Sequence, residues 1–182
     1  MSQQFFRDVS PEDAELQPIL TGLFGEYATR YGDFFRNQPE VVELTEWYLP
    51  PQGLFIVLER DGEIIAMGAY KPYDENTAEL KRIWTRSDLR RQGLAAQILH
   101  ELERRALLAG YQRIFLTTGF RQPEAVRLYI SYGYQPQFDT TGDMERYGQP
   151  PHDGRLRFLK TIGAESVAQA SLRSSNEVTS ST

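Results

Sequence analysis

Residues 90–96 of this 182-residue chain combine two guanidinium groups, a glycine and small side chains at a predicted helix start: Arg90-Arg91-Gln92-Gly93-Leu94-Ala95-Ala96. The first backbone N–H groups of a helix have no intrahelical acceptor and lie at the positive end of the helix dipole, so they bind anions. Gly93 and Ala95 let an anion approach the backbone closely, and the two arginines add positive charge. The segment therefore predicts a phosphate site, with an ordinary helix start carrying exposed arginines as the alternative.

The kind of phosphate ligand is narrowed by what the sequence lacks. No Lys-Ser or Lys-Thr pair follows Gly93, as a magnesium-dependent nucleoside triphosphate loop requires, and no Gly-x-Gly-x-x-Gly is present. Cysteine is absent, and the only histidines, His100 and His152, lie 52 residues apart, so we expect neither thiolate chemistry nor a metal site. His100-Glu101 does not begin a zinc-protease motif, because residue 104 is arginine. A pyrophosphate bound without metal is the predicted ligand.

The distribution of charge along the chain indicates where an anionic and a cationic ligand would bind. The formal charge is −5, from 20 basic and 25 acidic residues, which argues against a nucleic-acid-binding domain. Residues 1–78 hold 5 basic and 14 acidic side chains, whereas residues 79–113 hold 8 and 4. We therefore expect an anionic ligand at the second segment and a cationic second ligand at the first, with solvated surface charge as the alternative. No apolar stretch approaches the length of a membrane span, so we expect a cytoplasmic protein without membrane contact.

Hydrophobic periodicity and turn residues predict the elements that position this segment. Strands are expected at 3–9, 53–58, 63–70, 77–85, 113–118, 134–138 and 155–161, and helices at 10–32, 39–48, 93–109 and 122–132. Asp61-Gly62 is typical of a tight hairpin turn. The strand at 77–85, the following helix and the strand at 113–118 form a βαβ unit, so the two strands should be parallel neighbours or near neighbours.

The length predicts one domain with its own core. We expect this domain to span residues 1–162. Residues 163–182 are small and polar without apolar periodicity, so they are expected to form a disordered C-terminal tail.

Four segments, in this order, resemble the GNAT superfamily of acetyl-CoA-dependent N-acetyltransferases. Arg90-Arg-Gln-Gly-Leu-Ala95 matches the family's Arg/Gln-x-x-Gly-x-Gly/Ala pyrophosphate motif, and Ala125 to Tyr134 match its Ala-x-x-Leu-Tyr-x-x-x-Gly-Phe/Tyr segment. Glu79 to Thr85 and Ile114 to Gly119 are similar to its central strand and the next strand. The resemblance covers residues 3–161 and implies a single α/β (α+β) domain with a mixed, mostly antiparallel twisted sheet, flanking helices and a central βαβ cofactor unit. It also implies a homodimer.

The resemblance implies an N-acetyltransferase that moves an acetyl group from acetyl-CoA to a primary amine by direct attack on the thioester. The amine belongs to a peptide or to a small molecule, polyamine-like or amino-acid-like. Such a reaction needs a neutral amine, a polarised carbonyl and a proton for the leaving thiolate. Tyr129, which shares the inward face of its predicted helix with Ala125 and Leu128, is the candidate acid. Glu79 is the candidate base, directly or through water; a core tyrosine and a strand-end carboxylate are the alternatives.

The resemblance also implies which residues contact the cofactor, with backbone N–H groups of the central strand polarising the thioester carbonyl. The expected contacts are Ile83, Trp84, Thr85, Arg90, Arg91, Gln92, Gly93, Leu94, Ala95, Ala96, Thr118, Glu124, Ala125, Leu128 and Tyr129. Two residues depart from the family pattern: Gln122 stands where many members carry asparagine, and Trp84 where a small β-branched residue is usual.

The acceptor pocket is expected to be built by the first two predicted helices and their loop, where aromatic and acidic side chains suit an amine: Tyr31, Asp33 and Phe34. Tyr27 lies on the apolar stripe of that helix and is expected in the core. Two other classes compete with the enzyme. A non-catalytic acyl-CoA sensor would need Arg91 and Gly93 but neither Tyr129 nor Glu79. A nucleic-acid-binding regulator would be consistent with the positive charge of residues 79–113 but not with the net charge of −5 of the whole chain.

Cutting the chain after Gly163 should leave folding and cofactor binding unchanged, because the removed segment has too few apolar residues to dock. Melting temperatures of the full and shortened chains, with and without acetyl-CoA, measure this. A large drop on truncation would show that the tail packs against the domain.

Overall fold

The computed structural model describes residues 3–35 and 43–163; of the tail expected at 163–182, all residues after Gly163 lie outside the described residues. Its strands are β1 Gln4–Asp8, β2 Leu54–Arg60, β3 Glu63–Asp74, β4 Thr77–Thr85, β5 Arg113–Gly119, β6 Gln135–Pro136 and β7 Arg155–Thr161. Its α-helices are α1 Gln17–Tyr31, α2 Leu94–Leu108 and α3 Pro123–Ser131. Short 3-10 helices are η1 Ala14–Leu16, η2 Thr45–Tyr48, η3 Ser87–Leu89 and η4 Met144–Gly148.

The strands form one sheet in the order β1-β2-β3-β4-β5-β7-β6. All neighbours are antiparallel except β4 and β5, which run parallel on either side of the α2 crossover. The predicted fold class, a mixed and mostly antiparallel sheet with a central βαβ unit, is confirmed. The Asp61-Gly62 turn is also confirmed, with φ of 51° and 84° at its two residues, as a tight hairpin turn needs.

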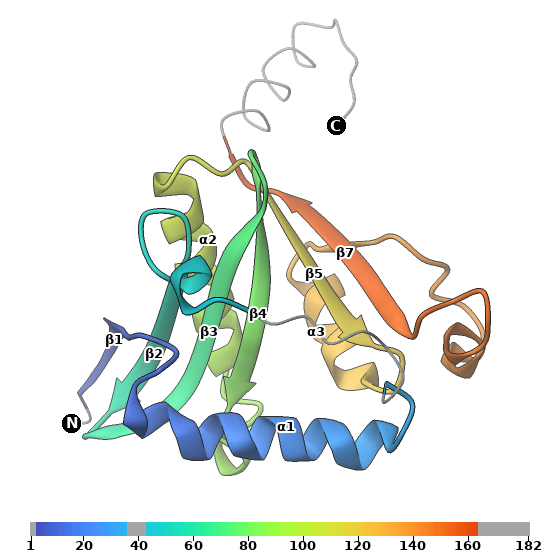
Figure 1. The fold of residues 1–182 in the computed structure, drawn as a ribbon, viewed down its shortest axis with the longest axis horizontal. Helices are drawn as coiled ribbons and strands as arrows, with labels where there is room; N and C mark the ends of the chain where they lie inside the picture. Colours follow the sequence, from blue (N-terminus) through green and yellow to red (C-terminus); the bar gives the residue numbers. More distant parts are fainter. Residues whose placement is uncertain (1–2, 36–42, 164–182) are drawn as a thin grey trace, which may run out of the picture.

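The parallel pair β4–β5 opens after three residues. Thr77 to Glu79 pair with Arg113 to Phe115, and no further pairing joins the two strands. In β4, Arg82 has a φ of 60° where the register with β3 shifts, which is a β-bulge that turns the strand away. Helix α1 runs across the end of the sheet at which β4 and β5 separate (Figure 1). The result is a sheet opened at its centre and crossed by a helix.

Apolar side chains cover the sheet on both faces. On one face α2 buries Leu94, Ile98, Leu99, Leu102 and Ala106 against alternate residues of β2 to β5, and α3 adds Tyr129. On the other face, Leu16, Tyr48, Phe55, Val57 and Met67 form a second cluster beneath η2 and the start of α1. The two clusters fix the sheet between helices on either side, so α1 and α2 approach the open end of the sheet from different sides.

The first helix begins later than the sequence predicts. Ser10 Oγ accepts a hydrogen bond from Glu12 N at 3.2 Å, and the Asp13 carboxylate accepts one from Ser10 N at 3.2 Å, so this segment closes a turn instead of capping a helix. The α-helix starts at Gln17, with Pro18 in its first turn. Both Pro11 and Pro18 are compatible with a helix start, and the helix begins next to Pro18 and not at Pro11.

Two other predicted elements are shorter in the structure. Of the helix expected at 39–48, residues 39–42 lie outside the described residues, and Leu44 is extended before the short η2. The strand expected at 134–138 is reduced to Gln135 and Pro136, followed by one backbone hydrogen bond from Gln137 N to Arg157 O at 2.8 Å. Strand β3 instead runs four residues past its predicted end at Tyr70, because Pro72 lies next to a register shift that tolerates its missing donor.

Gly68 permits the close approach of α2 to the bulge. A Cβ at this position would lie 2.6 Å from Ile98 Cγ2, 2.8 Å from Leu102 Cδ1 and 3.0 Å from Ile83 Cδ1. Gly68→Ala should therefore lower the free energy of unfolding by about 1–3 kcal/mol through overpacking. Gly25→Ala in α1, where nothing lies within 4 Å of the added Cβ, should raise it by about 0.5–1 kcal/mol. Urea unfolding of both variants measures the difference, and equal midpoints would show that α2 is not packed this closely.

Candidate functional site

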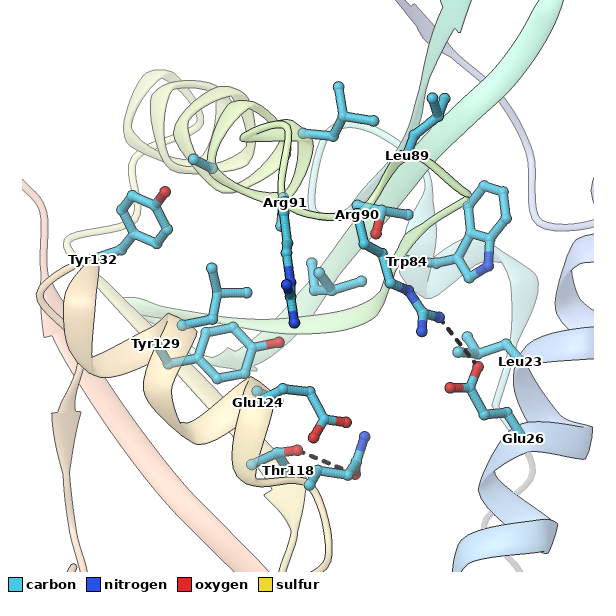
Figure 2. A pocket seen from close by; sticks show the side chains of 18 of the residues that line it. Leu23, Glu26, Trp84, Leu89, Arg90, Arg91, Thr118, Glu124, Tyr129 and Tyr132 are labelled. Carbon is cyan, nitrogen blue, oxygen red and sulfur yellow. Dashed lines mark hydrogen bonds and ion pairs between the residues drawn. The ribbon is translucent and has the colours of Figure 1, made fainter. Parts of the chain in front are cut away.

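A cavity of about 680 Å³ lies between α1, the end of β4, the start of α2 and α3 (Figure 2). Of the fifteen residues predicted to contact a cofactor, fourteen line it and Gln92 does not. Seven lining residues lie outside that prediction: Leu23, Glu26, Tyr27, Arg30, Leu89, Gln122 and Tyr132. The separated strands thus bring together the segments that the sequence pattern selects.

The start of α2 leaves backbone donors free at one wall of this cavity. Gly93 is the N-cap in the left-handed conformation with a φ of 77°, and no side chain caps the helix. The first intrahelical hydrogen bond runs from Gln97 N to Gly93 O at 3.1 Å, so the N–H groups of residues 93–96 precede it. Arg91 also has a positive φ, 70°, and successive turns of this kind gather N–H groups into an anion-binding concavity. The chain fits a pyrophosphate here without any metal ligand.

The two arginines of this segment are placed differently. Arg90 Nη2 lies 3.5 Å from Glu26 Oε2 of α1. Arg91 has no ion pair among the described residues, and its side chain extends into the space between α2 and α3 (Figure 2). A free guanidinium beside uncapped N–H groups strengthens the case for an anionic ligand.

Tyr129 of α3 is buried, yet its hydroxyl makes no hydrogen bond to any described residue. The ring packs between Tyr134 and Phe158, at 5.8 and 5.6 Å between centroids, while the hydroxyl points into the cavity (Figure 2). Burial raises the pKa of the Tyr129 phenol well above its ordinary value, so the group stays protonated. The expected inward face of this helix is thus correct, and the phenol is a donor available to a ligand.

Gln122 continues the cavity wall at the start of α3. Its Oε1 accepts hydrogen bonds from Thr118 Oγ1 at 3.1 Å, Gly119 N at 3.0 Å and the Tyr31 hydroxyl at 3.2 Å. Tyr31 in turn accepts a hydrogen bond from Arg121 N at 3.1 Å, and burial raises its pKa to about 12. The Gln122 carbonyl therefore holds the turn before α3, and its Nε2 has no partner among the described residues.

The predicted acceptor residues lie outside this cavity. Tyr31 is buried with its hydroxyl occupied as above, and Phe34 packs on Phe120 with ring centroids 5.0 Å apart. Asp33 is exposed in the turn after α1. Their role at an acceptor stays a prediction. The expectation for Tyr27 was wrong: it is 37% exposed and lines the cavity, because this flank of α1 borders the opening in the sheet and not the core.

Glu79 also lies outside the cavity, at the point where β4 and β5 separate. Its neighbours Ala78 and Leu80 belong to the α2 side of the sheet, so its side chain projects from the opposite face. There its Oε1 lies 3.9 Å from Lys71 Nζ. The candidate acid and the candidate base therefore approach β4 from different sides.

Comparison with known proteins assigns the family. The model of the Acetyltransferase (GNAT) family matches residues 20–134, and this chain belongs to that family, whose members use acetyl-CoA. The resemblance given by the sequence motifs is confirmed.

The relatives are distant. The chain is 30% identical over 103 residues to N-acetyltransferase family 8 member 2 of Rattus norvegicus, covering 54% of this chain and 46% of that protein. It therefore spans about half the length of the first curated relatives it matches. A putative acyl-CoA N-acyltransferase of Klebsiella pneumoniae shares the fold, with a TM-score of 0.68, 23% identity, and coverage of 88% of this chain and 98% of that one. A GNAT acetyltransferase of Elizabethkingia anophelis, solved with acetyl-CoA bound, has a TM-score of 0.55 and 17% identity, covering 87% and 98%.

No helix within residues 3–35 and 43–163 is both long and apolar enough to cross a bilayer.

Acetyl-CoA should raise the melting temperature, whereas ATP with magnesium should not, because the phosphate wall carries no metal ligand. At a hundredfold excess over its dissociation constant, a ligand stabilises by about 2.7 kcal/mol, roughly 5–10 °C for a domain of this size. Gly93→Val should abolish the shift. Gly110→Val is the matched control, since Gly110 also has a positive φ, 101°, and open space around it but lies at the far end of α2. Stabilisation by ATP alone would overturn the cofactor assignment.

Proposed function

We propose that this protein is an N-acetyltransferase that transfers the acetyl group of acetyl-CoA to a primary amine of a small molecule or peptide by direct attack on the thioester. The observation that carries the proposal is the cavity itself. It joins an uncapped, arginine-flanked helix start at one wall to a free, buried phenol at the other. Membership of the GNAT family supports the same reaction.

Arg91 and the N–H groups of residues 93–96 would hold the pyrophosphate of acetyl-CoA, and the side chains of α3 would line its pantetheine arm. Bound there, acetyl-CoA supplies an activated thioester carbonyl. Backbone groups of residues 83–85 face the opening left by β5, so their N–H groups are placed to polarise that carbonyl. Gln122 Nε2 is a further donor to the cavity, at the start of α3.

Proton transfers divide between Tyr129 and Glu79. The C–N bond forms while the C–S bond breaks; the ammonium proton goes to Glu79, directly or through water, and the phenol proton of Tyr129 goes to the leaving thiolate. Tyr129 suits this role because its raised pKa keeps the proton available over the whole physiological range. Glu79 suits its role because it projects from the other face of β4, away from the departing thiolate.

A non-catalytic acyl-CoA sensor would need the phosphate wall alone. A sensor would not need the Tyr129 hydroxyl, which points into the cavity and makes no hydrogen bond to any described residue. Release of free thiol from acetyl-CoA, tested against polyamines, amino acids, aminoglycosides and peptide N-termini, distinguishes the two. A homodimer, implied by the resemblance, is tested by sedimentation.

Tyr129→Phe should leave acetyl-CoA affinity nearly unchanged and lower turnover on the order of a hundredfold, the usual effect of losing one positioned acid. The ring keeps its packing, and only the hydroxyl is lost. Single-turnover measurement is needed because slow product release can hide the chemical step. Tyr73→Phe, which removes a hydroxyl from an exposed ring outside the cavity, is the control.

The pH profile of the wild-type enzyme gives a second readout of the role of Tyr129. An unperturbed phenol would make the rate fall near pH 9 to 10, but the raised pKa of Tyr129 keeps it protonated there. The wild-type rate should therefore rise as the amine or its base deprotonates and stay high to about pH 10. Normal turnover in Tyr129→Phe would show that the acid is solvent or another group.

A further inference from the structure

A second cluster of charged side chains lies on the face of β4 opposite the large cavity. Glu79 and Lys81 project from this face of β4, and Lys71 projects from β3 beside Glu79. Arg82 stands at the bulge, and Glu43 precedes η2. All five side chains are at least partly buried, with exposed fractions between 14% and 28%.

Glu43 shows how this cluster binds a carboxylate. Its Oε2 accepts hydrogen bonds from Lys71 Nζ and the Tyr48 hydroxyl, each at 2.8 Å, and its Oε1 accepts one from Arg82 Nη2 at 2.8 Å. Burial alone would raise the pKa of Glu43, but these donors and the charge of Lys81 outweigh it and hold the pKa below its usual value. A carboxylate is therefore well stabilised at this place on the sheet.

Within the described part of the chain, this cluster holds one more positive charge than negative. Among the described residues it contains three cations, Lys71, Lys81 and Arg82, against the two carboxylates of Glu43 and Glu79. Lys81 Nζ makes no hydrogen bond within the described part of the chain, and its one ion pair there is the long contact of 4.0 Å to Glu43. Burial lowers the pKa of Lys81, and the nearby Arg82 and Lys71 add to this effect, whereas Glu43 and Glu79 oppose it. A carboxylate from a ligand would restore the balance, whereas a second ammonium would worsen it.

An apolar pocket of about 180 Å³ opens beside these charges, between α1 and η2. Its lining includes Leu20, Phe24 and Phe55, together with Glu43 and Arg82. The guanidinium of Arg82 lies over the Phe24 ring, 5.0 Å from its centroid. The pocket therefore offers space for an apolar group next to the place where a carboxylate is needed.

Adjacent residues at the bulge of β4 line the two cavities. Arg82 lines the small pocket, and the next three residues line the large cavity. Helix α1 divides them in the same way, with Leu20 and Phe24 on one flank, and Leu23 and Tyr27 on the other. An acceptor in the small pocket would thus reach β4 from the side opposite the thiol leaving group.

We propose that the acceptor is an α-amino acid with an apolar side chain, whose carboxylate binds Lys81 and Arg82 while its amine lies toward Glu79. The inference rests on the proposed acetyl transfer and names its substrate class. Residues i and i+2 of a strand lie about 7 Å apart, a span that an α-amino acid bridges with one hydrogen bond at each end. The Arg82 guanidinium has five N–H donors, of which Glu43 takes one, so it can bind a second carboxylate.

This substrate class reverses the expectation from the acidic charge of residues 1–78. Much of that charge lies away from β4 and is already paired: Glu15 and Glu59 with Arg7, and Glu63 with Arg86. The charge of a segment therefore does not give the charge of the surface that faces the acceptor.

Matched pairs of acceptors test the proposal with the intact enzyme. Phenylalanine, leucine and tryptophan are compared with phenethylamine, isopentylamine and tryptamine in the thiol-release assay. The specificity constant should be on the order of a hundredfold higher for each acid than for its decarboxylated partner, because the latter has no carboxylate to pair with the partly buried Lys81 and Arg82. Equal constants within each pair, or acetylation of polyamines alone, would overturn this inference and leave the proposed function standing. No transfer to any amine of the full panel would overturn the proposed function itself.

Lys81→Met separates the binding role from a structural one. The variant should lose most of the discrimination within each pair, chiefly through a higher KM for the acid, while acetyl-CoA still raises its melting temperature. Arg104→Met, which removes an exposed cation from α2, should keep the wild-type discrimination. Unchanged discrimination in Lys81→Met would overturn the assignment of the carboxylate to this cluster.

Discussion

The separation of β4 from β5 is the constraint on which the rest of this structure depends. Three residues of parallel pairing hold the strands together, and beyond Glu79 and Phe115 the ladder is open. Backbone groups at such an opening need partners, and no strand supplies them. The bulge at Arg82 sets the direction in which β4 leaves its neighbour, so a local backbone feature makes the cavity. The same unpaired peptide groups are what a thioester or pantetheine amide would use.

Helix α1 closes this opening with weak ties. Arg90 pairs with Glu26 at 3.5 Å and Glu124 with Arg30 at 2.5 Å, so α1 is linked to both walls of the cavity. Partly exposed pairs of this kind contribute about 0–1 kcal/mol each. The packing of Leu16 at the start of α1 and of the Tyr27 and Tyr31 rings near its end therefore positions the helix, and the ion pairs can exchange with an anionic ligand.

Local sequence signals predicted the bounds of single strands and helices better than the way these elements pack against one another. The bounds of β4 and β7 and the parallel β4–β5 pair follow from alternation and from the short crossover, which are local properties. Local signals do not predict three other features, because each depends on where a distant segment packs. These features are the opening after Glu79, the positive φ of Arg82 and the position of Tyr27 in the cavity lining. Pattern alone could select most of the cofactor wall, since it lies on two continuous helix starts. It could not find the charged cluster, whose members come from three separated segments.

Strand β4 also acts as a partition in the proposed chemistry. Tyr129 lies on the side of β4 that faces α2 and α3, and the Glu79 side chain projects from the opposite face of the strand. The proton of the acceptor amine would therefore be removed on one face, and the proton of the leaving thiol delivered on the other. This division keeps an acid of raised pKa and a carboxylate base from exchanging a proton with each other directly. It also gives each face its own charge requirement. The cofactor side presents arginines and free N–H groups to a pyrophosphate, whereas the described side chains of the acceptor cluster hold three cations against two carboxylates. An acceptor that brings its own carboxylate satisfies the second requirement without disturbing the first.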